Sequence, residues 1–102
     1  MLFGGLQVRI VNVKKLEDCF DGSTIYSYEF DDVWTYKQIQ SLEILGELSY
    51  YKDFPKPFFR VNVSGGMQIK GVEGENSCTV FFPKKGKEEM KEKLEMHFTG
   101  NL

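Results

Sequence analysis

Alternating apolar and polar positions predict two β-strands in the first third of the chain. Residues 6–13 alternate over their first five positions, a pattern typical of a strand with one solvated face. Residues 24–30 form the second run, and a period of two divides its side chains between two faces. One of these faces carries Thr24, Tyr26, Tyr28 and Phe30. The polar segment between the strands ends in the turn signal Asp21-Gly22, so we expect a hairpin with a long connection.

A capping-box pair predicts a helix over residues 36–45. Thr35 is followed three positions later by Gln38, and in such a box each side chain bonds the backbone amide of the other residue. Gly46 suits the left-handed position that commonly follows a helix. The apolar face of this helix is formed by Ile39, Leu42 and Leu45, and Trp34 stands where a hydrophobic staple to Ile39 would begin.

Three further runs rich in branched and aromatic residues follow one another across Gly-rich turns, which predicts an antiparallel meander. These runs cover residues 58–63, 67–72 and 77–82. Alternation in the first run predicts core positions for Phe59, Val61 and Val63. The opposite face then receives Phe58, Arg60 and Asn62. The preceding segment, residues 48–54, is predicted to be either a short edge strand or irregular, because the prolines after it cannot donate to a ladder.

A final helix is predicted after the turn at residues 83–86. On this otherwise charged segment a narrow apolar stripe recurs at helical spacing, formed by Met90, Leu94, His97 and Phe98. His97 is the only histidine of the chain, and we interpret it as a packing residue rather than a catalytic base. Gly100 is expected to close the helix.

The element order β-β-α-β-β-β-α predicts an α+β fold. We expect a two-layer sandwich in which an antiparallel sheet of about five strands carries two helices packed on one face. With 102 residues, the chain is expected to form a single domain over residues 1–102. The strand order stays open, because meander and ferredoxin-like arrangements share this pattern. The helix-free face is either solvated or covered by a second subunit.

Charge and composition exclude several classes of protein. The 13 basic and 15 acidic residues give a formal net charge of −2, which argues against a general nucleic-acid binder. No apolar run approaches the roughly 20 residues that a membrane-spanning helix needs. The first residues lack the basic and apolar regions of a secretory signal. We therefore expect a cytoplasmic protein, and in a reducing compartment Cys19 and Cys78 are expected as free thiols. Their spacing leaves a disulfide between them open as the alternative.

Aromatic residues on the predicted wet face are the main functional indication. Phe58 and Phe81 both fall where alternation predicts solvent, and exposed apolar patches usually mark contact surfaces. We therefore expect a non-enzymatic interaction module that forms a homodimer, or binds a protein partner, through the helix-free face. The residues named for this interface are Phe58, Arg60, Phe81, Tyr26 and Tyr28, since aromatics and Arg are enriched at interfaces. The same aromatics would suit a stacking platform for single-stranded RNA, against which the net charge again argues.

The alternative hypothesis is a small-molecule or metal-ion site with a possible enzymatic role. It would use either the loop that carries Asp18 and Asp21 or the aromatic and proline-rich segment of residues 50–59. The acidic spacing does not match a calcium-binding loop, which supplies six to eight oxygens. No cofactor is predicted, because Gly65, Gly66, Gly71 and Gly74 lie between strands instead of before a helix. The basic residues 84–87 do precede a helix and could hold an anion, but we interpret them as a solvated turn. No catalytic residue is predicted either.

Overall fold

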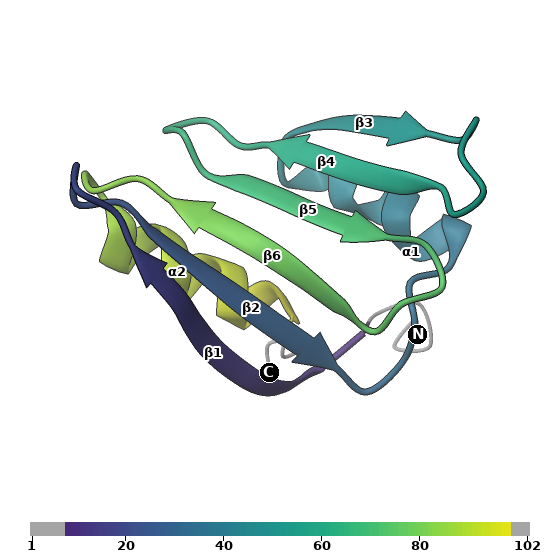
Figure 1. Cartoon of the computed structure of the whole chain (residues 1–102), viewed down its shortest axis with the longest axis horizontal. Coiled ribbons are helices and arrows are strands. Elements are labelled where there is room, and N and C mark those ends of the chain that lie inside the picture. Colours follow the sequence, from purple (N-terminus) through teal and green to yellow (C-terminus); the bar gives the residue numbers. More distant parts are fainter. Residues whose placement is uncertain (1–7, 99–102) are drawn as a thin grey trace.

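The computed structural model describes residues 8–98, which form an α+β fold built on one antiparallel sheet. Six strands lie in the order β1-β2-β6-β5-β4-β3, and both helices lie behind this sheet in Figure 1. The strands are β1 (Ile10–Asp18), β2 (Thr24–Phe30), β3 (Glu47–Tyr51), β4 (Phe58–Asn62), β5 (Gln68–Val72) and β6 (Ser77–Phe82). The helices are α1 (Tyr36–Ser41), the short 3-10 helix η2 (Leu42–Ile44) and α2 (Lys87–Phe98).

This strand order resolves the topology that the sequence left open. Strands β3 to β6 form a four-stranded meander, and the β1–β2 hairpin joins it through the pairing of β2 with β6. The prediction of an α+β fold with an antiparallel sheet and two helices is confirmed. The predicted number of about five strands was one too low. The additional strand is β3, which lies at one edge and turns Leu48 and Tyr50 toward the core beside Val61 and Phe59.

The first strand was placed too early in the sequence. It spans Ile10–Asp18 instead of residues 6–13, of which 6 and 7 lie outside the described part of the chain. Every residue of β1 after Ile10 is exposed, so both faces of this edge strand are solvated and the apolar–polar alternation of residues 11–14 does not mark a buried face. The connection to β2 is correspondingly short and covers only residues 19–23.

The start of α1 follows the sequence signal, whereas its end does not. Gln38 N donates to Thr35 Oγ1 and Thr35 N donates to Gln38 Oε1, each at a distance of 3.3 Å. The capping box is therefore confirmed. The α-helix ends at Ser41 and continues as the 3-10 turn Leu42–Ile44. Gly46 is not among the left-handed glycines, so its predicted cap role is wrong. A Cβ at this position would instead collide with the backbone carbonyl of Asn62.

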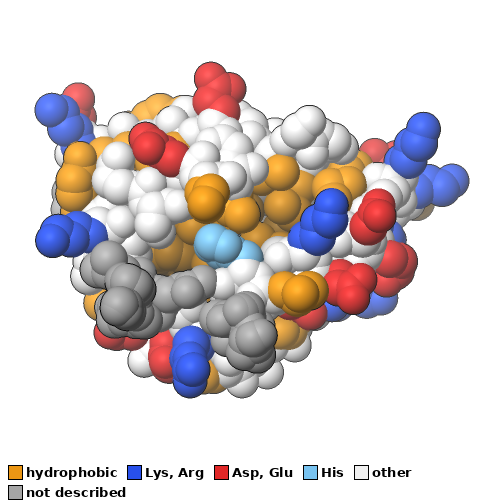
Figure 2. Space-filling view, turned by 180° about the vertical axis from the view of Figure 1, so that it is seen from behind, with side chains coloured by type: hydrophobic (Ala, Val, Ile, Leu, Met, Phe, Trp, Pro, Cys, Tyr) orange, Lys and Arg blue, Asp and Glu red, His pale blue; other side chains and the backbone are white. Residues whose placement is uncertain are grey.

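The core lies between the sheet and the two helices. Trp34 stands at its centre, with ring centroids 5.1 Å from Phe59 and 5.3 Å from Phe30, and its Nε1 donates to Ser77 O over 3.0 Å. Leu94 and Phe98 of α2 are buried against this cluster. The helices do not cover the sheet completely. Figure 2 shows apolar side chains reaching the surface in the middle of the helix-bearing face, around the single pale blue side chain.

Candidate functional site

The helix-free face of the sheet carries a polar row in its middle. Phe59 and Val61 are fully buried on the helix side, so the residues between and beside them in β4 point the other way. Arg60 pairs with Ser49 of β3 on one side and with Lys70 of β5 on the other. Lys70 in turn pairs with Thr79 of β6. Because paired residues share a face, two cationic side chains lie next to each other on the uncovered surface.

A groove of about 770 Å³ opens along this row, and we call it the Arg60 groove. Its residues come from four neighbouring strands, from the β3–β4 loop and from the turn before β6. They are Tyr51, Phe54, Lys56, Phe58, Phe59, Arg60, Lys70, Gly71, Val72, Glu75, Ser77, Cys78 and Thr79. In Figure 1 this part of the sheet is the right-hand half, with its helix-free face toward the viewer.

Three aromatic rings form one wall of the groove. The ring of Phe58 stacks on Tyr51 with centroids 4.6 Å apart and an interplanar angle of 20°. Phe54, from the proline-bounded loop, lies 5.0 Å from Phe58 and remains 52% exposed. Cross-strand aromatic pairs of this kind stabilise a sheet and also present a flat apolar surface. A planar ligand would find a stacking surface here.

Arg60 stands beside this wall with most of its hydrogen-bonding capacity unused by the described residues. Its Nη2 donates to the Tyr51 hydroxyl over 3.0 Å, while its buried Nε has no hydrogen-bond partner in the described structure. The hydrogen bond from Arg60 lowers the pKa of Tyr51, and a contact with Ser49 acts in the same direction. None of the ion pairs between described residues includes Arg60 or Lys70. The site therefore holds two adjacent cations and no carboxylate paired with either.

The groove also contains an ion pair, two hydroxyl groups and a buried thiol. Lys56 and Glu75, which both line the groove, form an ion pair over 3.6 Å. Ser77 and Thr79 contribute hydroxyl groups to the lining. Burial raises the pKa of the Cys78 thiol, which keeps it protonated at neutral pH. Cys78 and Cys19 are both free thiols, which decides between the two states that the sequence left open.

Two of the predicted interface residues lie on the wrong face. Tyr28 is fully buried and donates its hydroxyl to Glu95 of α2 over 2.8 Å. Tyr26 packs edge-on against Phe82, and Lys91 of α2 lies 4.9 Å from its ring centre. Alternation correctly grouped these tyrosines on one face of β2, but it does not say which face the helices cover. Tyr26 and Tyr28 therefore cannot share a surface with Arg60.

The other predicted interface residues do lie on the helix-free face. Phe58 forms the aromatic wall, and Arg60 lies beside it. Phe81 is half-buried outside the groove, where it pairs with Ile25 of β2 and Gln68 of β5. The segment of residues 50–59 was identified from sequence as a possible ligand wall. Lys70 and Thr79 were missed, because only the pairing of β4, β5 and β6 brings them beside Arg60.

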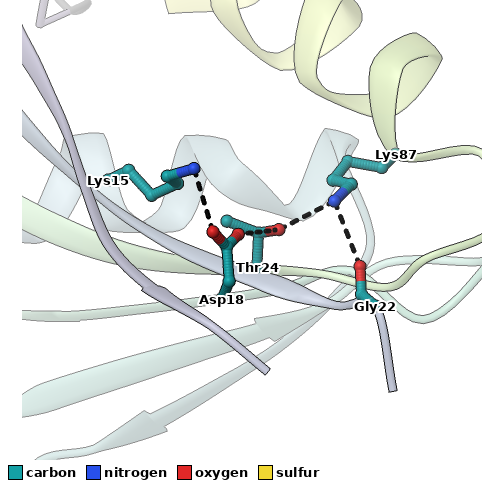
Figure 3. Close-up of polar contacts among 5 residues, drawn as sticks. All are labelled: Lys15, Asp18, Gly22, Thr24 and Lys87. Carbon is teal, nitrogen blue, oxygen red and sulfur yellow. Dashed lines mark hydrogen bonds and ion pairs between the residues drawn. The ribbon is translucent and has the colours of Figure 1, made fainter. Parts of the chain in front are cut away.

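Asp18 and Asp21 are engaged in local structure and do not converge on a metal. Asp18 accepts hydrogen bonds from Lys15 Nζ over 3.0 Å and from Thr24 Oγ1 over 3.3 Å (Figure 3). Lys87 of α2 extends this network by donating to Thr24 Oγ1 and to Gly22 O. Asp21 accepts from the amide and hydroxyl of Ser23. Within residues 8–98, no three His, Cys, Asp or Glu side chains are grouped to hold a metal ion.

Comparison with known proteins does not assign the chain to a family: no family model, no curated protein and no solved structure matches it. No helix in the described part of the chain is long and apolar enough to span a membrane.

Proposed function

We propose that this chain is a small binding module that holds an organic anion with a flat apolar body in the Arg60 groove. The single observation that carries this proposal is the juxtaposition of Arg60 and Lys70. The two cations are opposite each other on neighbouring strands, and neither is paired with a carboxylate among the described residues. Like charges opposite each other destabilise a sheet, and a bound anion would remove that repulsion.

The guanidinium also favours an anionic ligand through its hydrogen-bonding groups. Arginine carries five N–H donors in a planar fork that suits carboxylate and phosphate oxygens. The buried Nε of Arg60 has no acceptor among the described residues, and such a group costs about 1–3 kcal/mol. An anion beside the guanidinium would offer the missing acceptor after a small rotation of the side chain.

The aromatic wall of the groove is the reason for proposing that the ligand has a flat apolar body. The stacked pair of Tyr51 and Phe58, extended by Phe54, offers ring faces next to the two cations. The volume of about 770 Å³ lies within the range of roughly 300–1,000 Å³ that small-molecule sites occupy. An aromatic or conjugated acid would place its ring on this wall and its charge at Arg60.

Calorimetric titration with a matched pair of probes tests the proposal. The probes are 2-naphthoate and the neutral 2-naphthalenemethanol, which share a ring system and differ in charge. We expect the native chain to bind the naphthoate more tightly, and Arg60→Gln to weaken naphthoate binding by about tenfold or more while leaving the alcohol unchanged. The reason is the loss of charge-assisted hydrogen bonds, which are worth about 1.5–3 kcal/mol.

The chain supplies its own control for this experiment, because Arg9 is its only other arginine and is exposed outside the groove. Arg9→Gln makes the same change of net charge and should bind both probes as the native chain does. Equal affinities of the native chain for naphthoate and alcohol would contradict the proposal. So would equal losses in the Arg60 and Arg9 variants.

A further inference from the structure

The polar row on the helix-free face continues across every strand of the sheet. Its members, taken in the order β3, β4, β5, β6, β2 and β1, are Ser49, Arg60, Lys70, Thr79, Ser27 and Lys14. The row therefore holds three cations, three hydroxyl groups and no carboxylate. Of these side chains, Arg60, Lys70 and Thr79 line the Arg60 groove.

Carboxylates flank this row without entering it. Glu47 of β3 and Glu29 of β2 each lie two residues from a member of the row, so they belong to the rows on either side. Glu75, which lines the groove, is already paired with a lysine of the β3–β4 loop. A ligand with a single negative charge would leave one of the two groove cations uncompensated, and like charges opposite each other repel. A ligand with two negative charges would balance Arg60 and Lys70 together.

The three groups of the row that line the groove are hydrogen-bond donors. Arg60 offers guanidinium N–H groups, Lys70 an ammonium and Thr79 a hydroxyl, and they come from three neighbouring strands about 4.8 Å apart. A carboxylate has two oxygens in one plane, whereas a phosphate ester has three terminal acceptor oxygens that point in different directions. A phosphate above β5 would accept from all three side chains at once.

The aromatic wall begins one row away from these donors. Phe58 and Arg60 are two residues apart in β4 and share a face, so they are separated by about 7 Å along the strand. Tyr51, which stacks on Phe58, is in the same relation to Ser49 of the row. This separation suits a ring that lies on Phe58 and carries its phosphate directly or through a short linker.

We propose that the organic anion of the Arg60 groove is an aromatic phosphomonoester, bound with its phosphate among Arg60, Lys70 and Thr79 and its ring on Phe58. This inference rests on the proposed function and adds to it the class of acid and a binding role for Lys70 and Thr79. Phosphomonoesters match the charge of the site, because their second pKa is about 6 and they are close to dianionic at neutral pH.

Calorimetric titration with 2-naphthyl phosphate and 2-naphthyl sulfate at mildly alkaline pH tests the class of acid. The two esters share a ring system and a tetrahedral acid group, but the sulfate carries only one negative charge. We expect the native chain to bind the phosphate more tightly by about tenfold. Lys70→Gln should reduce this preference by about fivefold or more, because the second charge loses its partner. Thr79→Val should weaken phosphate binding by about threefold or more.

Lys14→Gln is the matched control for Lys70→Gln. It makes the same change in the same row, at the far edge of the sheet and outside the groove, and should keep the native preference. Far-ultraviolet circular dichroism checks that every variant is folded. Equal affinities of the native chain for the two esters would overturn the inference. An equal loss of preference in the Lys70 and Lys14 variants would overturn it as well.

Two further probes separate this inference from the proposed function. If 2-naphthoate binding depends on Arg60 while the phosphate ester has no advantage over the sulfate, the inference fails and the proposed function stands. If binding of neither the naphthoate nor the phosphate ester depends on Arg60, both fail. Inorganic phosphate should bind more weakly than the naphthyl ester by about tenfold or more, since it lacks a ring to stack. Equal affinities for these two would overturn the assignment of an aromatic ester.

Discussion

Replacing Phe59 by alanine is expected to lower the free energy of unfolding by about 3–5 kcal/mol. The side chain is fully buried in β4, and its ring lies 5.1 Å from that of Trp34 at the centre of the core. It also covers Gly71 of β5, where a Cβ would collide with the ring. Alanine would leave a cavity between these neighbours, and packed strands can close such a space only in part. Urea unfolding followed by circular dichroism measures the loss.

Phe54→Ala is the matched control for this experiment. Phe54 carries the same ring but is 52% exposed in the β3–β4 loop, so its truncation should lower the free energy of unfolding by less than about 1 kcal/mol. Similar losses in the two variants would contradict a core centred on Trp34 and Phe59.

Replacing Gly46 by alanine is expected to lower the free energy of unfolding by about 1–3 kcal/mol. Gly46 joins η2 to β3 and is not in a left-handed conformation, so backbone strain is not the cause. The added methyl group would meet the backbone carbonyl of Asn62 in β4, which cannot move without disturbing the β3–β4 pairing. Thermal and urea unfolding of the variant test this expectation.

The neighbouring change Ile44→Ala serves as the control, since Ile44 is 80% exposed and should contribute little to stability. A neutral or stabilising effect of Gly46→Ala would contradict the close approach of the two backbones. In that case the gain would come from the smaller conformational entropy of the unfolded chain, which favours alanine over glycine wherever alanine fits.

Local signals in the sequence predicted local structure well. The Thr35 and Gln38 capping box is decided by residues three positions apart, and it begins α1 as expected. The predicted role of Gly46 as a helix cap was wrong. Glycine is needed there because the backbone of Asn62 lies close by, and Asn62 is sixteen positions away in sequence and approaches Gly46 only in the folded sheet. The start of β1 was misplaced because the pattern of one buried and one solvated face does not exist on an exposed edge strand.

The candidate site illustrates the same division between local and long-range information. The aromatic segment that carries Tyr51, Phe54 and Phe58 was identified from its composition. Lys70 lies beside Arg60 only because of the register in which β4 pairs with β5. The pattern of residues within each strand does not determine that register. Tyr26 and Tyr28 were assigned to the wrong surface for a related reason. Alternation along a strand shows which residues share a face, but it does not show which face the helices cover.

The most direct test of the proposed function observes the arginine side chains during a titration. A ¹⁵N-labelled chain has two arginine Nε–Hε groups, those of Arg9 and Arg60, which nuclear magnetic resonance detects separately. With added 2-naphthoate, the Arg60 signal should shift progressively to saturation, together with backbone amides of β4 and β5, while the Arg9 signal stays in place. An unchanged Arg60 signal at naphthoate concentrations that shift other residues would show that the anion binds elsewhere, and would contradict the account.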